Sequence, residues 1–230
     1  MIAILTAAGK GERFRKSSLV QSLPKQLIKI NRKPVIYYSL IALENCDEID
    51  EIFVTCSNEY IVTIDKIASK NNISKLTMFV EGGKTRFESV RNAFNQIIAG
   101  DDELVLIHDA VRPNITSGLI DDMINNIGKN DDGIVIGTKI TDTVKKVKNG
   151  NIKETIDRSE LWTVQTPQIF KYSVLKQSYK KAGRKKDFTD ESAMVENSGF
   201  KVKIYEGSIE NIKITVPEDI ELLNKLWKKK

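Results

Sequence analysis

Short apolar runs alternate along the chain with longer stretches in which apolar positions recur at a helical period. The apolar runs are bounded by turn residues and predict strands at residues 2–6, 51–56, 76–80, 104–107, 133–137 and 201–205. The amphipathic stretches predict helices, some with a capping residue or proline at the start, at residues 34–43, 61–71, 86–98, 117–127, 172–182, 190–197 and 217–228. Strands that alternate with helices are typical of an α/β fold whose mostly parallel sheet has helices on both faces. Ligands of such sheets bind beyond the carboxyl ends of the strands.

One segment, at about residues 139–158, departs from this alternation. It is rich in threonine and lysine, and it contains Asn149-Gly150 between two β-prone runs, TVKKV and IKETI. An Asn-Gly pair between such runs is a strong signal for a tight β-hairpin. The sequence leaves open whether this hairpin is a plain surface feature or an arm that reaches another subunit.

The composition narrows the class of protein. A chain of 230 residues with 40% hydrophobic and 29% charged residues can bury a sizeable core and fits one large domain or two small ones, of which we expect a single domain over residues 1–230. Cys46 and Cys56 lack CxxC spacing and His108 is the sole histidine, so neither a disulfide framework nor a zinc site is indicated. No apolar run approaches the roughly 20 residues that span a bilayer. The first residues lack the features of a signal peptide, so we expect a core strand there and a cytoplasmic protein.

The net charge of +5 would suit nucleic acid, a membrane surface or small anions as partners. The cations that cluster, as at residues 180–186 and 228–230, have no aromatic residues between them. Single-stranded nucleic acid is usually bound by basic grooves with interleaved aromatics, so this pattern disfavours a nucleic-acid-binding module. The isolated cations beside glycines are the ones that point to a ligand.

The run AAGKGER at residues 7–13 follows the first predicted strand directly. Its small residues let the backbone approach a nucleotide, and its N–H groups can bind phosphates. It is not a dinucleotide fingerprint, which needs a third glycine where Phe14 stands, and it lacks the Gly-Lys-Ser/Thr of a Walker A loop. Arg13 stands where a fixed cation would meet a polyphosphate. Alone, the run fits a tight turn with a surface arginine equally well.

Two further loops carry a lone cation or paired glycines. Lys25, in Pro24-Lys25-Gln26, offers a point charge, although a lone lysine is usually solvated. The run GGKTRFESV at residues 82–90 follows a strand and opens a helix. It is not a Walker A loop, because the earlier glycine of that motif would fall at Met78. A glycine pair at a helix N-terminus favours an anion or nucleobase site over a simple cap.

The predicted strand at residues 104–107 runs into HDAVRP, residues 108–113. Asp109 can hold a magnesium ion or a ribose hydroxyl there, and Arg112 can bind a phosphate. The alternative is that Asp109 caps a turn and His108 is a satisfied, half-buried residue, but the position at a strand end favours function. Weaker motifs follow, namely Arg158, LW at 161–162, QTPQ at 165–168, TDE at 189–191 and NIKITVPED at 211–219.

The order and spacing of these motifs resemble the 2-C-methyl-D-erythritol 4-phosphate cytidylyltransferase family of non-mevalonate isoprenoid synthesis, over essentially the whole chain from Ala7 to Asp219. The resemblance implies a Rossmann-like nucleotidyltransferase fold and a homodimer joined through the hairpin arm. It also implies transfer of the cytidylyl group of CTP to 2-C-methyl-D-erythritol 4-phosphate (methylerythritol phosphate) with Mg²⁺. The products would be 4-diphosphocytidyl-2-C-methyl-D-erythritol and pyrophosphate.

The resemblance assigns roles by matching position. Arg13 and Lys25 would stabilise the charge on the triphosphate, and Arg158 and Lys213 would complete the catalytic set. The residues that would bind CTP are Ala7, Ala8, Gly9, Gly82, Gly83, Arg86, Ser89, Asp109 and Ala110, with Asp109 also the metal ligand. The residues that would bind the acceptor are Arg112, Thr143, Arg158, Thr166, Thr189, Lys213 and Thr215, of which Thr143 and Arg158 would come from the partner's arm.

Two points remain open at this level. Residues 14–23 form a longer stretch than in many members of the family, so they fit a lid and leave the resting position of Lys25 undefined. The alternative acceptor is ribitol 5-phosphate, which relatives with the same chemistry use. Those relatives tend to carry Ala-Gly-Gly in the first loop, where this chain has Ala7-Ala8-Gly9.

Overall fold

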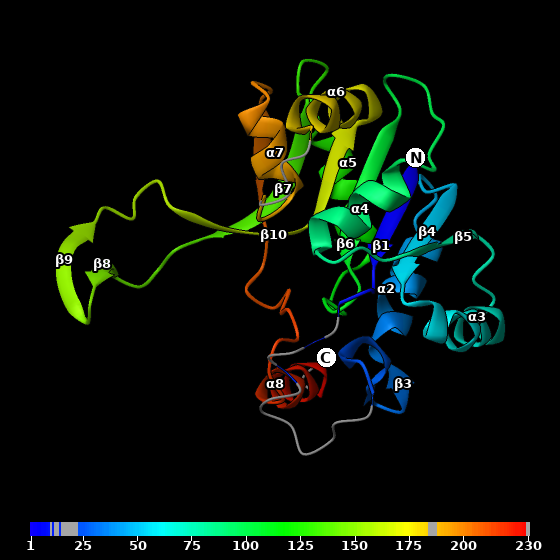
Figure 1. Ribbon diagram of the computed structural model, residues 1–230. Helices are drawn as coiled ribbons and strands as arrows, with labels where there is room; N and C mark the ends of the chain where they lie inside the picture. The colour runs from blue at the N-terminus through cyan, green and yellow to red at the C-terminus, as the bar shows by residue number, and fades with distance from the viewer. Residues whose placement is uncertain (10, 12–13, 15–22, 184–187, 229–230) are drawn as a thin grey trace.

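A seven-stranded sheet forms the centre of the computed structural model, which describes residues 1–9, 11, 14, 23–183 and 188–228 (Figure 1). The strands lie in the order β11-β7-β10-β6-β1-β4-β5. Their bounds are β1 (Ile2–Thr6), β4 (Glu51–Cys56), β5 (Leu76–Glu81), β6 (Leu104–Asp109), β7 (Gly133–Lys139), β10 (Trp162–Lys171) and β11 (Val202–Glu206). Only β10 runs antiparallel to its neighbours in this sheet. The expectation of a mostly parallel sheet is therefore confirmed.

Helices cover both faces of the sheet. On one face lie α2 (Val35–Glu44), α3 (Ile61–Lys70) and α5 (Ser117–Asn125), and on the other lie α4 (Arg86–Phe94), α6 (Tyr172–Ala182) and α7 (Glu191–Asn197). Strand β1 shows why both faces are apolar: Ala3 and Leu5 pack into the first core, whereas Ile2 and Ile4 pack into the second. Successive side chains of a strand point to opposite faces, so a strand buried on both sides has to be apolar throughout.

A smaller third core lies below the carboxyl end of the sheet. It joins α8 (Glu218–Trp227) to the short ribbon of β2 (Lys29–Ile30) and β3 (Lys33–Pro34), and it buries Phe14 and Ile214. The indole N–H of Trp227 donates to Asn114 Oδ1 at 2.9 Å. The described residues also contain two short 3₁₀ turns, η1 (Lys25–Leu27) and η2 (Asn58–Tyr60). The third core therefore fixes the segments next to Lys25 and Lys213.

The predicted helix starts agree with the caps that the structure shows. Thr85, Thr116 and Asp190 each accept a backbone N–H of the first turn with their side chains, at the starts of α4, α5 and α7. Helix α4 ends at Phe94 rather than at residue 98 as predicted. The N–H groups of Gln96 and Ile97 bond to carbonyls three residues back, which is the tighter turn that often closes a helix.

Strand β10 is absent from the prediction. Its segment contains Pro167 and several polar residues, and neither feature is typical of a central strand. The structure resolves this conflict by interrupting the pairing of β10 with β7 between Val164 and Gln168. Pro167 lies in that gap, so its missing N–H removes no bond from the ladder.

The predicted hairpin is present as β8 (Val144–Lys148) and β9 (Asn151–Ile156), which pair antiparallel. Asn149 and Gly150 both have positive φ, 51° and 76°, as a tight two-residue hairpin turn requires. The hairpin stands away from the rest of the chain on two extended connections that continue β7 and β10 (Figure 1). None of the described helices combines the length and the apolar character needed to cross a bilayer.

Candidate active site

A cavity of about 520 Å³ opens at the carboxyl ends of β1 and β6. The first loop, the α4 loop and the segment before α8 all contribute to its wall. The predicted site residues that line it are Ala7, Ala8, Gly9, Lys25, Gly83, Arg86, Ser89, Asp109, Lys213 and Thr215. Residues up to 209 positions apart in the chain thus meet where an α/β sheet is expected to bind its ligand.

The glycines of the loop before α4, Gly82 and Gly83, are required by close packing. A Cβ atom on Gly82 would stand 2.1 Å from Ala8 Cβ, and one on Gly83 would stand 2.3 Å from Glu88 Cβ. The N–H of Gly83 donates to Ser89 Oγ at 3.0 Å, and Ser89 Oγ donates to the carbonyl of Thr85 at 2.9 Å. The two glycine-bearing loops therefore pack directly against each other, and both contribute to the wall of the cavity.

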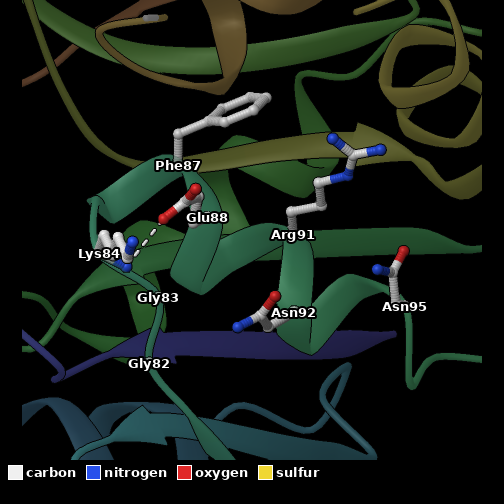
Figure 2. Close-up of a pocket in the computed structure, with 8 residues that line it drawn as sticks. All are labelled: Gly82, Gly83, Lys84, Phe87, Glu88, Arg91, Asn92 and Asn95. Carbon is white, nitrogen blue, oxygen red and sulfur yellow. Dashed lines mark hydrogen bonds between the residues drawn. The ribbon is translucent and has the colours of Figure 1, made fainter. Parts of the chain in front are cut away.

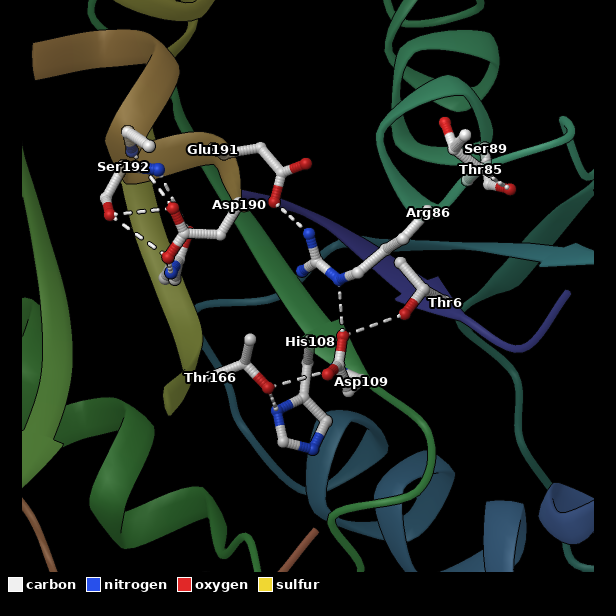
Figure 3. Close-up of polar contacts among 12 residues, drawn as sticks. Thr6, Thr85, Arg86, Ser89, His108, Asp109, Thr166, Asp190, Glu191 and Ser192 are labelled. Atoms are coloured by element: carbon white, nitrogen blue, oxygen red, sulfur yellow. Dashed lines mark hydrogen bonds and ion pairs between the residues drawn. The ribbon is translucent and has the colours of Figure 1, made fainter. Parts of the chain in front are cut away.

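Charged side chains form a buried network at the floor of the cavity (Figure 3). Asp109, with 4% of its surface exposed, accepts from Arg86 Nε at 2.8 Å and Thr6 Oγ1 at 3.1 Å through Oδ1. Its Oδ2 accepts from Lys213 Nζ at 2.5 Å. Burial alone would raise the pKa of Asp109, but Arg86 and Lys213 outweigh it and hold that pKa well below its usual value. Asp109 is therefore a fixed anion that anchors two cations.

Lys25 lies against the chain segment that carries Lys213. Lys25 Nζ donates to the carbonyl of Ile214 at 2.9 Å, so its ammonium lies against the residue that follows Lys213. The N–H groups of Thr215 and Val216 both donate to Asp219 Oδ2, which fixes this segment to the start of α8. The chain thus brings two ammonium groups to one side of the cavity, as a polyanionic ligand requires.

His108 is buried beside this network in a single orientation. Its Nε2 lies 3.1 Å from the carbonyl of Arg112, which can only accept, so Nε2 carries the proton. Its Nδ1 lies 3.2 Å from Thr166 Oγ1, which itself accepts the N–H of Asp109 at 3.0 Å. Thr166 therefore donates to His108. Burial lowers the pKa of His108 to about 4, so the imidazole is neutral and holds the end of β6 in place.

The lowered pKa of His108 predicts a loss of stability in mild acid. The unfolded chain takes up this proton near pH 6.5 and the folded chain only near pH 4, so stability is full above pH 6.5 and declines as the pH falls between these values. The expected loss from this residue is about 3 kcal/mol. As the only histidine, His108 gives a single imidazole signal in NMR spectra, and we expect that signal not to titrate between pH 7.5 and 5. A midpoint near 6.5 would contradict the buried, neutral imidazole.

Several predicted residues do not line the cavity. Ala110, Arg112 and Thr166 are buried behind its wall, where Arg112 Nη1 donates to the carbonyl of Asn211 at 2.7 Å. Gly82 lies in an adjoining cavity of about 150 Å³. Thr189 is exposed before α7. Arg13 lies outside the described residues.

The two predicted residues of the arm lie apart from the cavity of their own chain. Thr143 and Arg158 are exposed at the base of the hairpin, where an Arg158 N–H donates to the carbonyl of Thr141. Figure 1 shows the hairpin directed away from the segments that form the cavity. The structure of one chain therefore does not unite them with Lys213.

The structure adds three residues that the motifs did not assign. Gln26 Nε2 donates to the carbonyl of Ala7 at 2.5 Å and fixes the first loop, and Thr6 bonds to Asp109. Glu191 binds Arg86 Nη1 at 2.6 Å. Gln26 and Glu191 stand inside motifs quoted above, and Thr6 ends a predicted strand. Their positions were visible in the sequence, but their contacts depend on the fold.

A groove of about 690 Å³ lies on the outer side of α4 and shares Gly83 and Lys84 with the cavity (Figure 2). Lys84 donates its backbone N–H to Glu88 there at 2.8 Å. Arg91, Asn92 and Asn95 point in different directions along the helix instead of converging (Figure 2). The groove is larger than the cavity, but polar groups converge only in the cavity, which is therefore the candidate active site.

Known proteins match the chain over nearly its full length. The family model described as 2-C-methyl-D-erythritol 4-phosphate cytidylyltransferase matches residues 1–228. The protein of that name from Clostridium novyi is 40% identical over 96% of this chain and 93% of its own length. The one from Clostridium botulinum is 38% identical over 98% and 96%.

A solved structure agrees with these relatives. The crystal structure of 4-diphosphocytidyl-2C-methyl-D-erythritol synthase from Anaerococcus prevotii has a TM-score of 0.81 and 29% identity, with 99% of this chain and 97% of that chain covered. The fold, the motifs and these matches extend over the same residues. The chain belongs to the 2-C-methyl-D-erythritol 4-phosphate cytidylyltransferase family.

Proposed function

We propose that the chain transfers the cytidylyl group of CTP to methylerythritol phosphate, in non-mevalonate isoprenoid synthesis. An oxygen of the acceptor phosphate attacks the α-phosphorus of CTP, the bond from that phosphorus to the bridging oxygen breaks, and pyrophosphate leaves. The observation that carries the proposal is the cavity itself. It gathers Lys25, Lys213 and residues of two glycine-bearing loops around one space at the carboxyl ends of the strands. The family membership of the chain supports the same reaction.

The side chains of this site act by position and charge. Phosphoryl-type transfer needs little covalent help from the protein, and most of the rate comes from orientation and from cations near the developing charge. Lys25 is assigned to the triphosphate, and Lys213, oriented by Asp109, is assigned to the acceptor phosphate. The glycine surface formed by residues 82 and 83 is assigned to cytosine.

We also propose Mg²⁺ as the metal of the reaction, with Asp109 as its protein ligand. Asp109 Oδ1 already accepts two hydrogen bonds, whereas Oδ2 accepts one and keeps a lone pair for an ion. The described residues contain no group of three or more His, Cys, Asp or Glu side chains that would enclose a metal. Such a site fits Mg²⁺, which commonly takes one carboxylate and completes its shell with water and substrate phosphates. The ion would neutralise charge on the triphosphate.

The proposal extends to the assembly. We propose that the chain acts as one domain with its arm at residues 139–158, and that two copies form a homodimer in which each arm supplies Thr143 and Arg158 to the partner's site. The exposed pair Val147 and Ile152, opposite each other on the hairpin, supports an apolar contact for the arm. A cytoplasmic location is supported by Cys46 and Cys56, which are free thiols, as is usual in reducing compartments.

The test of the proposed function is pyrophosphate release from CTP with a panel of polyol phosphates. We expect kcat/KM at saturating CTP to be at least about tenfold higher for methylerythritol phosphate than for ribitol 5-phosphate. A terminal phosphate is common to both, so the preference has to come from hydroxyls and the methyl group, for which a mismatch costs about 1–3 kcal/mol or more. We expect excess chelator to abolish turnover. A higher value for ribitol 5-phosphate would assign the chain to that acceptor, and absence of release with every acceptor would refute cytidylyl transfer.

Gly82→Ala is expected to lower kcat/KM for CTP by about tenfold or more. The new methyl group would meet Ala8 Cβ at 2.1 Å, so Ala8, which lines the cavity, has to move, and small displacements in a transfer site are costly. Gly100→Ala is the matched control, because a Cβ there meets no atom within 4 Å. Steady-state kinetics on both variants decide the point. Equal values for the two variants would contradict a role of the close loop contact.

A further inference from the structure

Glu191 is a buried carboxylate that the reaction described above does not use. It is the first residue of α7, and its side chain has no exposed surface. Arg86 Nη1 donates to its Oε2 at 2.6 Å, across a separation of 105 residues in the chain. Burial raises the pKa of Glu191, and Arg86 opposes that effect. A buried carboxylate destabilises the folded state unless an ion-pair partner compensates for the loss of hydration.

The contact of Glu191 continues through Arg86 to the catalytic side of the cavity. Arg86 donates from Nη1 to Glu191 and from Nε to Asp109 Oδ1 at 2.8 Å. Asp109 Oδ2 in turn holds Lys213 Nζ at 2.5 Å. The guanidinium is planar and its donors have fixed directions, so the two carboxylates together set its orientation. Figure 3 shows Arg86 extended between Glu191 and Asp109.

The start of α7 is itself held to the sheet. Asp190, the N-cap, accepts from Gln168 Nε2 at 2.8 Å and from the N–H of Ala193 at 3.0 Å. The N–H of Ser192 donates to Gln168 Oε1 at 3.3 Å. Gln168 lies in β10, the strand that also supplies Thr166 to the N–H of Asp109. The corner of β10 and α7 therefore fixes both the backbone and the carboxylate of Asp109.

Stability alone does not account for this arrangement. Buried ion pairs can often be replaced by apolar residues with little loss of stability, and α7 already buries Met194 and Val195 in the core. Within the described residues, Glu191 Oε1 and Arg86 Nη2 are buried without a hydrogen-bond partner, so the pair is not saturated. A half-satisfied polar network is a poor stabiliser. What Glu191 does provide is a second anchor for the Arg86 guanidinium.

We propose that Glu191 is a positioning residue, which through Arg86 orients Asp109 and thereby places the Lys213 ammonium for the transfer step. Without the charge of Glu191, Arg86 has Asp109 as its only carboxylate partner among these groups. The guanidinium is then free to turn and to compete with Lys213 for the Asp109 oxygens. The proposal rests on the proposed cytidylyl transfer and concerns the same site.

The test compares Glu191→Gln with Glu196→Gln, which makes the same change at an exposed position of the same helix. We expect Glu191→Gln to lower kcat by about 10- to 100-fold, because small displacements of a positioned group have effects of that size. KM for CTP should change by a smaller factor than kcat, since the glycine loops are untouched. Glu196→Gln should match the wild type in both values. Equal kinetics for the two variants would overturn the proposal.

A double variant separates positioning from a general loss of structure. In the Lys213→Ala background, Glu191→Gln should lower kcat by less than about twofold, because the group that it positions is gone. Full additivity of the two losses would overturn the proposal. If Glu191→Gln does not fold, Glu191→Asp replaces it: this variant keeps the charge but is shorter by one methylene. Its kcat should fall at least about fivefold, with a smaller change in KM for CTP, and a wild-type kcat would overturn the proposal. A wild-type enzyme that releases no pyrophosphate would instead refute the proposed function.

Discussion

Replacing Lys25 by alanine is expected to lower kcat by about 10²–10³-fold, the usual loss when one preorganised stabiliser of transition-state charge is removed. The ammonium lies in the cavity wall and donates to the carbonyl of Ile214 at 2.9 Å, so it stands beside Lys213. Negative charge grows on the leaving pyrophosphate as the bond to the α-phosphorus breaks. A cation fixed near that charge stabilises the transition state more than the ground state.

The control for this prediction is Lys29→Ala, four residues further along the chain, where the lysine is exposed. Both variants remove one positive charge, so a general electrostatic effect on a polyanionic substrate would appear in both. Thermal unfolding of the Lys25→Ala protein should stay close to that of the wild type, because a hydrogen bond of a partly exposed side chain contributes only about 1 kcal/mol. A Lys25→Ala enzyme with kcat near that of Lys29→Ala would remove Lys25 from the catalytic set.

Much of the fold follows from local pattern. Strands Ile2–Thr6 and Glu51–Cys56 have the predicted bounds, because both are short apolar runs between turn residues and neither is an edge strand of the sheet. The hairpin at Asn149 and Gly150 follows from the turn chemistry of two residues. Strand β10 could not be predicted in this way, since its polar residues and Pro167 are accommodated by a gap in its pairing with β7, which is a tertiary feature.

The site residues likewise divide into those that local motifs predict and those whose contacts depend on the tertiary fold. Motifs that follow strands directly, such as residues 7–9 and 108–109, could be assigned to the cavity because parallel strands end at one edge. The two ion-pair partners of Asp109 could not be assigned from the sequence, because Arg86 and Lys213 lie 23 and 104 residues away from it in the chain. Their meeting depends on which helices cover which face. Glu191 shows most clearly what the sequence could not predict, because its proposed role depends on a contact with Arg86 of another helix and it does not line the cavity.

Mixing two strongly impaired variants is expected to restore activity, and this is the sharpest test of a shared site. Arg158 lies on the arm and Lys213 in the cavity, and the arm stands away from the cavity of its own chain (Figure 1). If each arm completes the partner's site, Arg158→Ala and Lys213→Ala are each strongly impaired as homodimers. In a heterodimer, one site carries both defects and the other carries neither.

Random exchange of subunits makes half of the dimers mixed, so about a quarter of all sites become intact and about a quarter of wild-type kcat should return. If Arg158 served the cavity of its own chain, every site in the mixture would lack one group and no activity would return. Lys148→Ala, an exposed change elsewhere on the arm, controls for damage to the hairpin and should be active by itself. Sedimentation with one labelled variant has to show that subunits exchange. Exchange without recovery would contradict the shared site, because every heterodimer whose arms complete the partner's sites contains one intact site.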